Sequence, residues 1–372
     1  MRYPGLDLLR AIAIVWVMLF HTYLIGGLGP DWSWLSRFGW MGVDLFFVLS
    51  GFLIGQQVLP PLAQGGRLDF GDFYLRRAFR VLPAFWVVLA LYALFPSLRE
   101  RPGLEPLWKF ATFLFNVTAD YSNSAFSQVW SLCVEEHFYL VFPVLALWLT
   151  GRIQRRELLW LCAGIVLTGI TLRSSIWLTD AQREGLGLES GNWFVEDIYY
   201  PTWNRLDGLL AGVMLAVARV WRQDAWNRLQ RHANAVLAAG ILLLGAAMWL
   251  FRDRVGLTGN ALGWPVLSAA MALLVFAGAG TTSVIGRWSV PGAEWVSLTS
   301  YSLYLVHKIA FGQVQTHLTA SLEGRPWLAV ATYAAATLLA GAVLHYAIER
   351  PFLQLRGRLL RVREPKAALA SV

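Results

Sequence analysis

Residues 8–27 read LLRAIAIVWVMLFHTYLIGG. This stretch is long enough to cross a bilayer as a helix, which takes about 20 mostly apolar residues. It also holds Arg10 and His21, and ionisable groups inside a membrane helix are costly and therefore candidates for function. Their separation of eleven residues places them on one helix face, about 16.5 Å apart along the axis. The stretch thus predicts both a membrane helix and a functional face on it.

Nine further apolar stretches have comparable length. The chain of 372 residues is 57% hydrophobic and only 15% charged, whereas a soluble domain carries about a quarter charged residues. We therefore predict an all-α integral membrane protein, a bundle of about ten transmembrane helices. The expected segments are 8–27, 39–58, 80–97, 129–149, 158–177, 203–220, 234–251, 262–280, 297–317 and 327–349.

Basic residues divide the connecting segments into two sets. If the N-terminus is cytoplasmic, the segments on that side hold more than twice as many Lys and Arg residues as the outer ones, as the positive-inside rule requires. We expect both termini in the cytoplasm, a membrane domain over residues 1–352 and a short basic tail over 353–372, suited to anionic lipid headgroups. This topology explains the net charge of +8 better than nucleic-acid binding does. The stretch 107–117 is too short to span and is expected at the interface or as a re-entrant segment.

Carboxylates lie in two of the other expected helices. Counted from the outer end of each segment at 1.5 Å per residue, His21, Asp44 and Glu135 all lie about 8–10 Å below the outer edge. Glu135 shares a helix face with Ser131 and Tyr139, so we expect it to point into the bundle. An imidazole beside a carboxylate suits general acid–base chemistry. The alternative is a buried polar pair that only holds helices together.

A second cluster is expected near the cytoplasmic edge. Arg76, Arg77 and Arg80 precede Pro83 in the third apolar stretch, and Arg77 and Arg80 share a face at i, i+3 spacing. With Arg10 they could bind phosphate, because guanidinium groups match phosphate geometry. The alternative is ordinary anchoring of the helix ends by basic residues.

Further polar residues of the apolar segments are secondary candidates. Glu136 follows Glu135 on the fourth segment. Tyr304 and His307 could line a passage between the two clusters or pack through hydrogen bonds, and Arg205 could pair with Asp207 or contact an acceptor. The loop 178–202 is acidic and aromatic, as expected of a solvated loop with interface anchors or of part of an acceptor site.

Five motifs occur in the order in which the bacterial membrane acyltransferase-3 family carries them, and they span nearly the whole chain. The sequence therefore resembles this family, which includes O-acetylases of surface polysaccharides, lipopolysaccharide and peptidoglycan. The motifs are Leu6-Asp7-Leu8-Leu9-Arg10 with His21, Gly42 to Phe52, Arg77 and Arg80 before Pro83, Trp130 to Tyr139, and Ser300 to His307 with Ile348 to Phe352.

The resemblance implies an acyl-CoA donor, with Arg77 and Arg80 on the donor side. It implies His21 as the catalytic histidine with Arg10 as its motif partner, and Glu135 as the more important acid. Ser50, inside the second motif, joins the candidates.

The resemblance implies transfer of an acyl group, acetyl by similarity to the family, from cytoplasmic acyl-CoA to a hydroxyl of an outer-side glycan or glycolipid. The expected site of action is the bacterial inner membrane, and no metal is expected to take part. The rival hypothesis is a proton-coupled transporter, because such carriers also hold ionisable groups inside the membrane.

Overall fold

The computed structural model describes residues 3–25, 36–120, 124–152, 154–187 and 192–368, and these contain helices and no strand. Ten longer helices occupy the ten expected segments. They are α1 (Pro4–Ile25), α3 (Met41–Ala63), α4 (Phe70–Leu94), α6 (Val129–Leu149), α7 (Arg155–Gly185), α8 (Leu206–Trp221), α10 (Ala233–Leu250), α11 (Trp264–Gly278), α13 (Ala293–Leu322) and α14 (Pro326–Leu344).

Short helices join them. These are η2 (Pro96–Leu98), α5 (Leu107–Ala111), η3 (Phe115–Val117), η4 (Phe194–Tyr199), η5 (Thr202–Asn204), α9 (Gln223–Gln230), η6 (Gly259–Gly263), α12 (Val284–Arg287) and η7 (His345–Glu349). The stretch 107–117 is short and broken, as expected. The tail begins as a helix, α15 (Arg350–Ala368), and residues 369–372 of the expected tail lie outside the described part.

Eight helical segments in the described part are long and apolar enough to cross a membrane. The two expected segments that miss this mark are α8, which has 16 residues, and α13, which has 30. Helix α13 is long but carries polar residues, among them Ser297, Ser302 and His307, which are buried against other helices. The buried polar groups of α13 are thus satisfied by neighbouring helices rather than by lipid.

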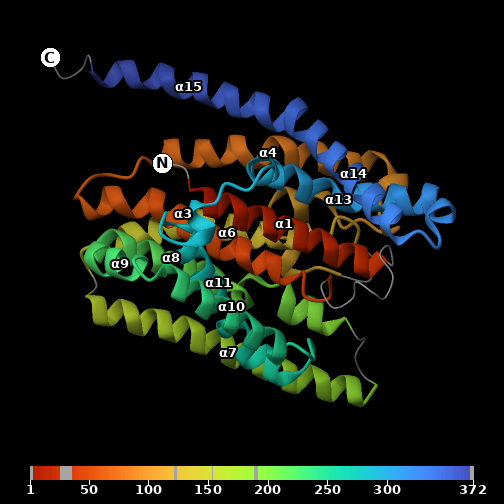
Figure 1. The fold of residues 1–372 in the computed structure, drawn as a ribbon, viewed down its shortest axis with the longest axis horizontal. Helices are drawn as coiled ribbons and strands as arrows, with labels where there is room; N and C mark the ends of the chain where they lie inside the picture. The colour runs from red at the N-terminus through yellow and green to blue at the C-terminus, as the bar shows by residue number, and fades with distance from the viewer. Residues whose placement is uncertain (1–2, 26–35, 121–123, 153, 188–191, 369–372) are drawn as a thin grey trace.

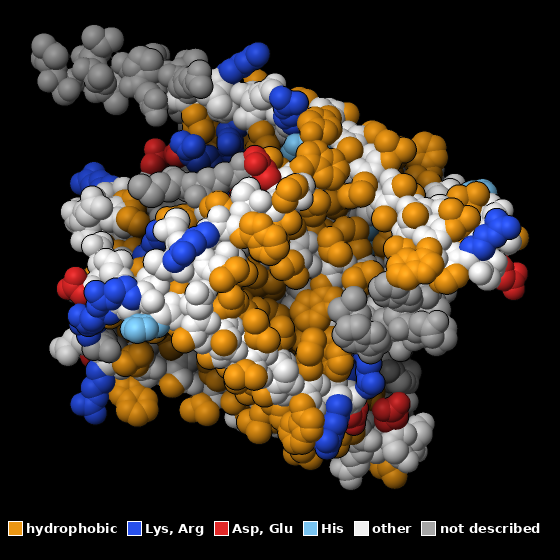
Figure 2. Space-filling model, in the orientation of Figure 1, with side chains coloured by type: hydrophobic (Ala, Val, Ile, Leu, Met, Phe, Trp, Pro, Cys, Tyr) orange, Lys and Arg blue, Asp and Glu red, His pale blue; other side chains and the backbone are white. Residues whose placement is uncertain are grey.

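The helices lie roughly parallel to the long axis of the molecule (Figure 1). In the most apolar stretch of α3 and in that of α11, 61% of the residues are buried inside the protein. The corresponding fraction is 11% in α7 and 17% in α10. Hydrophobic side chains cover the middle of the face in Figure 2, and most of its Lys and Arg side chains lie to the left. We call this the arginine-rich end. It holds the first residues of α1 and α4.

The closest helix contact joins α3 and α8. A Cβ on Gly51 would lie 2.1 Å from the main-chain oxygen of Leu209, and one on Gly212 would lie 2.1 Å from that of Val48. Only glycine permits this approach, which is how small residues let membrane helices associate. The contact fixes α3, and with it Asp44 and Ser50.

Candidate active site

A cavity of about 230 Å³ lies between α1, α3, α4, α6 and α13. Apart from Gln57, its charged and polar lining comes from residues that the sequence singled out. These are Arg10, Ser50, Arg77, Arg80, Ser131, Glu135, Glu136, Tyr139, Ser300, Tyr301 and Tyr304. The apolar lining includes Phe46 and Phe47 of α3. The structure thus confirms that Arg10 approaches the arginine pair of α4, although it lies on another helix.

The cavity's arginines lack acidic partners at contact distance. Within the described residues, Arg10, Arg77 and Arg80 form no ion pair and donate no hydrogen bond, and the Nε of Arg77 is buried without a hydrogen-bond partner. The guanidinium of Arg77 instead lies over the ring of Tyr139, 3.8 Å from its centre. Arg76 differs, because it is exposed and pairs with Asp72 at 2.6 Å. Arg76 therefore does not line the cavity.

Glu135 is the most firmly held acid of the cavity. Ser50 Oγ donates to its Oε1 at 2.9 Å, and the Tyr139 hydroxyl lies 2.7 Å from its Oε2. The same hydroxyl lies 3.0 Å from Ser50 Oγ, which closes a three-membered network. This arrangement confirms that Ser131, Glu135 and Tyr139 share the inward face of α6.

Tyr304 lines the cavity from α13. Its hydroxyl lies 2.6 Å from Ser131 Oγ and donates to the main-chain oxygen of Gln128 at 3.0 Å. The Gln128 side chain in turn donates to the main-chain oxygen of Leu305 at 3.1 Å. We call Tyr304, Ser131 and Gln128 the Tyr304 junction. It ties α6 to α13 beside the cavity.

His21 lies beyond this junction, beside His307. The two ring centres are 4.6 Å apart, and the ring of His307 lies 5.6 Å from that of Tyr304. Nδ1 of His21 lies 2.9 Å from the main-chain oxygen of Val17, and Nδ1 of His307 lies 2.7 Å from that of Tyr304. Because a carbonyl oxygen only accepts, each Nδ1 carries the hydrogen and each Nε2 is an acceptor in the neutral ring.

The surroundings of this histidine pair are cationic rather than acidic. The positively charged side chains of Lys308 and Arg254 interact electrostatically with His21. Lys308 is itself held 2.5 Å from Ser127 Oγ and 3.4 Å from a carboxylate oxygen of Glu100. Nε2 of His307 is buried without a hydrogen-bond partner. The pair thus presents two imidazole acceptors in a packed site.

These contacts correct the expected pairing of His21 with Glu135 or Asp44. The depth of each residue below the outer edge was counted from the outer end of its segment, on the assumption that this end lies at the membrane surface. Residues 124–128, which precede α6, are instead buried, with at most 4% of any side chain exposed. Helix α6 therefore begins inside the bundle, and Glu135 lies further toward the arginine-rich end than the count suggested.

Asp44 belongs to a separate network. Its Oδ1 lies 2.7 Å from Arg205, and Asp207 instead pairs with Arg173 at 2.8 Å. This result corrects the expected Arg205–Asp207 pair. Arg173 escaped the sequence analysis although it is a charged residue in the middle of an apolar segment. Gly169, one turn earlier on α7, leaves room for its guanidinium, since a Cβ there would lie 3.0 Å from Arg173 Nη1.

The family model that describes an acyltransferase domain matches residues 3–346, which is nearly the whole chain. The chain belongs to this acyltransferase family. Two relatives illustrate it. The chain is 30% identical over 326 residues to the "Putative peptidoglycan O-acetyltransferase YrhL" of Bacillus subtilis, and 28% identical over 328 residues to the "Peptidoglycan O-acetyltransferase OatA" of Listeria monocytogenes.

Each alignment covers 82% of this chain and 48% of the relative, so the chain spans about half the length of these proteins. No solved structure matches the chain. Membership of the acyltransferase family agrees with the resemblance that the motifs indicated. With its several spanning helices, this family member is a multi-pass membrane protein.

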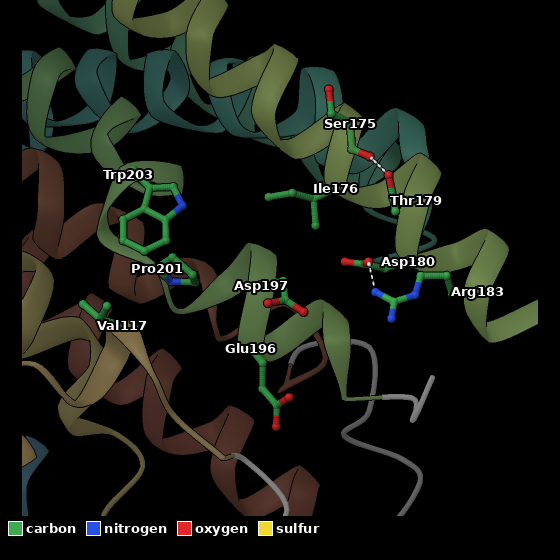
Figure 3. Close-up of a pocket in the computed structure, with 10 residues that line it drawn as sticks. All are labelled: Val117, Ser175, Ile176, Thr179, Asp180, Arg183, Glu196, Asp197, Pro201 and Trp203. Atoms are coloured by element: carbon green, nitrogen blue, oxygen red, sulfur yellow. Dashed lines mark hydrogen bonds and ion pairs between the residues drawn. The ribbon is translucent and has the colours of Figure 1, made fainter. Parts of the chain in front are cut away.

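A second hollow of this acyltransferase-family chain lies away from the arginine-rich end, where α7 ends (Figure 3). It has a volume of about 420 Å³ and is lined in part by Asp180, Glu196, Asp197 and Trp203. Asp180 and Arg183 lie 3.9 Å apart at its rim. Three acidic residues of the stretch 178–202 thus line this hollow, whereas its aromatic residues Trp193, Phe194, Tyr199 and Tyr200 do not. Neither His21 nor His307 lines it.

Proposed function

We propose that the chain is an O-acyltransferase that moves an acyl group, most simply acetyl, from acyl-CoA to a hydroxyl on the other side of the membrane. One observation supports this most. A cavity lined by three arginines is also lined by Tyr304, one helical turn before His307, and His307 contacts His21. A donor with phosphates at one end and a thioester at the end of a long arm fits that order.

The arginine-rich end is assigned to the cytoplasm by the positive-inside rule, which places acyl-CoA on the correct side. Arg10, Arg77 and Arg80 would hold the diphosphate, because charge-assisted bonds from guanidinium to phosphate are strong. Glu135 acts here as a positioning residue. It holds Tyr139, and the ring of Tyr139 supports the guanidinium of Arg77.

The reaction joins the acceptor oxygen to the acyl carbon and breaks the carbon–sulfur bond. Nε2 of His21 takes the proton of the attacking hydroxyl, and the departing thiolate receives a proton to give free CoA. The main-chain oxygen of Val17, rather than a carboxylate, fixes the tautomer that leaves Nε2 free. Transient acylation of His21 is the two-step alternative, in which the imidazole first displaces CoA thiolate and the acceptor hydroxyl then attacks the acyl group and frees the imidazole.

The acceptor we propose is a glycan or glycolipid of the bacterial cell envelope, reached from the inner membrane. The names of both relatives state a peptidoglycan acceptor. Membership of an acyltransferase family favours this chemistry over the proton-coupled transporter. The two differ in outcome, because a transporter moves its substrate unchanged, whereas a transferase adds mass.

The test compares surface glycans and lipids by mass spectrometry in cells that lack the chain, carry it, or carry a well-expressed His21→Ala variant. His317→Ala is the matched control, because His317 is exposed on the same helix as His307. We expect a gain of one acyl unit that requires the chain and His21 but not His317. A gain that survives His21→Ala would contradict the role of His21. Absence of any acyl gain with the native chain would contradict the transferase itself.

A further inference from the structure

Helix α15 brings one more arginine to the mouth of the cavity. Phe352 of α15 contacts Phe79 of α4, with ring centres 6.4 Å apart. Four residues later, Arg356 lies close enough to Arg76 and Arg80 of α4 for their charges to repel it. Arg356 is half-buried, whereas Arg358 of the same helix is exposed.

Arg356 has no acid of its own. Its Nε is buried without a hydrogen-bond partner. The acid that attracts it is Asp72, and Asp72 already pairs with Arg76 at 2.6 Å. Burying part of a guanidinium without a hydrogen-bond partner is unfavourable, because the lost hydration is not replaced. An anion bound beside Arg356 would supply the missing hydrogen-bond partner.

The charges around Arg356 point to a polyanion. Arg10 and Arg80 also repel one another, while Glu135 and Asp7 attract Arg10. The arginines form a row of like charges from the cavity to α15, with these carboxylates near Arg10. Such a row destabilises the compact state unless an anion offsets it. Guanidinium groups favour phosphate, which they can bind through two parallel hydrogen bonds.

Arg356 lies outermost in this row. Helix α15 continues outward from Glu349, which accepts from Ser302 at 2.7 Å, level with the cavity. Seven residues of helix carry Arg356 about 10 Å further along the axis. In coenzyme A the 3′-phosphate lies further from the thioester than the diphosphate does.

We propose that Arg356 binds the 3′-phosphate of the CoA donor, outside the diphosphate site of Arg10, Arg77 and Arg80. This inference rests on the proposed acyl-CoA donor. The shared chemistry is a phosphate group, so a lipid headgroup is the competing source. A comparison of CoA with 3′-dephospho-CoA separates the two, since only the soluble ligand changes.

The experiment measures equilibrium binding of CoA and 3′-dephospho-CoA to the purified full-length chain in phospholipid-free detergent. The native chain, Arg356→Gln and the matched control Arg358→Gln are compared, with the melting temperature as a check on folding. We expect the native chain and Arg358→Gln to prefer CoA about tenfold, as one charge-assisted contact would give. In Arg356→Gln this preference should fall to about one, with unchanged affinity for 3′-dephospho-CoA.

Two outcomes would overturn the inference while leaving the donor intact. The preference for CoA could persist in Arg356→Gln, as a lipid-binding role for Arg356 predicts. Arg356→Gln could instead weaken both ligands equally, which would mean a structural role or contact with the diphosphate. Failure of the native chain to bind either ligand would instead contradict the acyl-CoA donor of the proposed function and this inference with it.

Discussion

Two sets of arginines in the helix bundle, one buried and one half-buried, differ in their partners. Arg173 and Arg205 each form an ion pair, and both also donate to main-chain oxygens. The guanidinium of Arg205 lies in addition over the ring of Trp264, 4.0 Å from its centre. Arg77 and Arg80, near the arginine-rich end, have no acid at contact distance and line a cavity.

This difference separates structure from binding. A buried charge with all its partners inside the protein holds helices in place, and removing one partner leaves the other uncompensated. A charge that lacks partners and faces a cavity is available to a ligand. We therefore read the Asp44–Arg205 and Asp207–Arg173 pairs as structural and the cavity's arginines as the donor site.

The largest effect should follow from breaking a structural pair. Asp44→Ala leaves Arg205 buried without its carboxylate, which should lower the free energy of unfolding by about 3–5 kcal/mol. Denaturation in mixed micelles measures this. The double variant Asp44→Ala with Arg205→Met should recover part of the loss, because an apolar replacement of the pair needs no counter-charge. If Asp44→Ala alone is as stable as the native chain, the Asp44–Arg205 pair does not stabilise the fold.

Arg77→Gln should have the opposite profile. We expect the unliganded chain to lose no more than about 2 kcal/mol of stability, since the contact with the Tyr139 ring is lost but no ion pair is. CoA affinity should fall about tenfold or more, because a charge-assisted contact is removed. Calorimetric binding and the melting temperature with and without CoA report both quantities. If Arg77→Gln destabilises the unliganded chain as Asp44→Ala does, the two sets of arginines are not distinct.

Tyr139 sharpens the comparison, because it supports Arg77 through its ring. Tyr139→Leu removes the cation–π contact, worth about 0.5–2 kcal/mol, and should weaken CoA binding by at most the corresponding factor, about two- to thirtyfold. Tyr139→Phe keeps the ring and loses only the hydroxyl beside Glu135, so its CoA affinity should stay closer to that of the native chain. Equal losses in the two variants would assign the effect to the hydroxyl network instead.

The smallest effect is expected at Asp72. Its pair with Arg76 is part-exposed, with 47% of the Arg76 side chain and 33% of the Asp72 side chain accessible. Surface pairs contribute about 0–1 kcal/mol, so Asp72→Ala should change the free energy of unfolding by no more than that. A loss comparable to that of Asp44→Ala would show that burial does not explain the ranking.

The helices and much of the cavity could be predicted from the sequence. Apolar length located all ten long helices, and helical spacing placed Glu135 and Tyr139 on one face. The meeting of Arg10 with Arg77 and Arg80 was also expected, because all three lie near one end of their helices. Their role in binding acyl-CoA stays a prediction.

The partners of buried charges could not be predicted. Spacing along one helix does not say which neighbouring helix an acid faces, so Asp44 met Arg205 rather than His21. The predicted depth of Glu135 was wrong for a similar reason. Nothing in residues 124–128 alone reveals that they enter the bundle before α6 begins. Arg173 carried a usable signal, as a charge in the middle of an apolar segment, but its partner lies 34 positions away on another helix.

The glycine contact between α3 and α8 has a consequence for how the protein is built during synthesis. Helix α8, with 16 residues and Asp207 in its first turn, is too short to span a lipid bilayer readily by itself. It is made long after α3, which by then is already in the membrane. We expect α8 to enter against α3 as a template, so that a bulkier residue at Gly51 or Gly212 would act first on membrane integration and only afterwards on the finished enzyme.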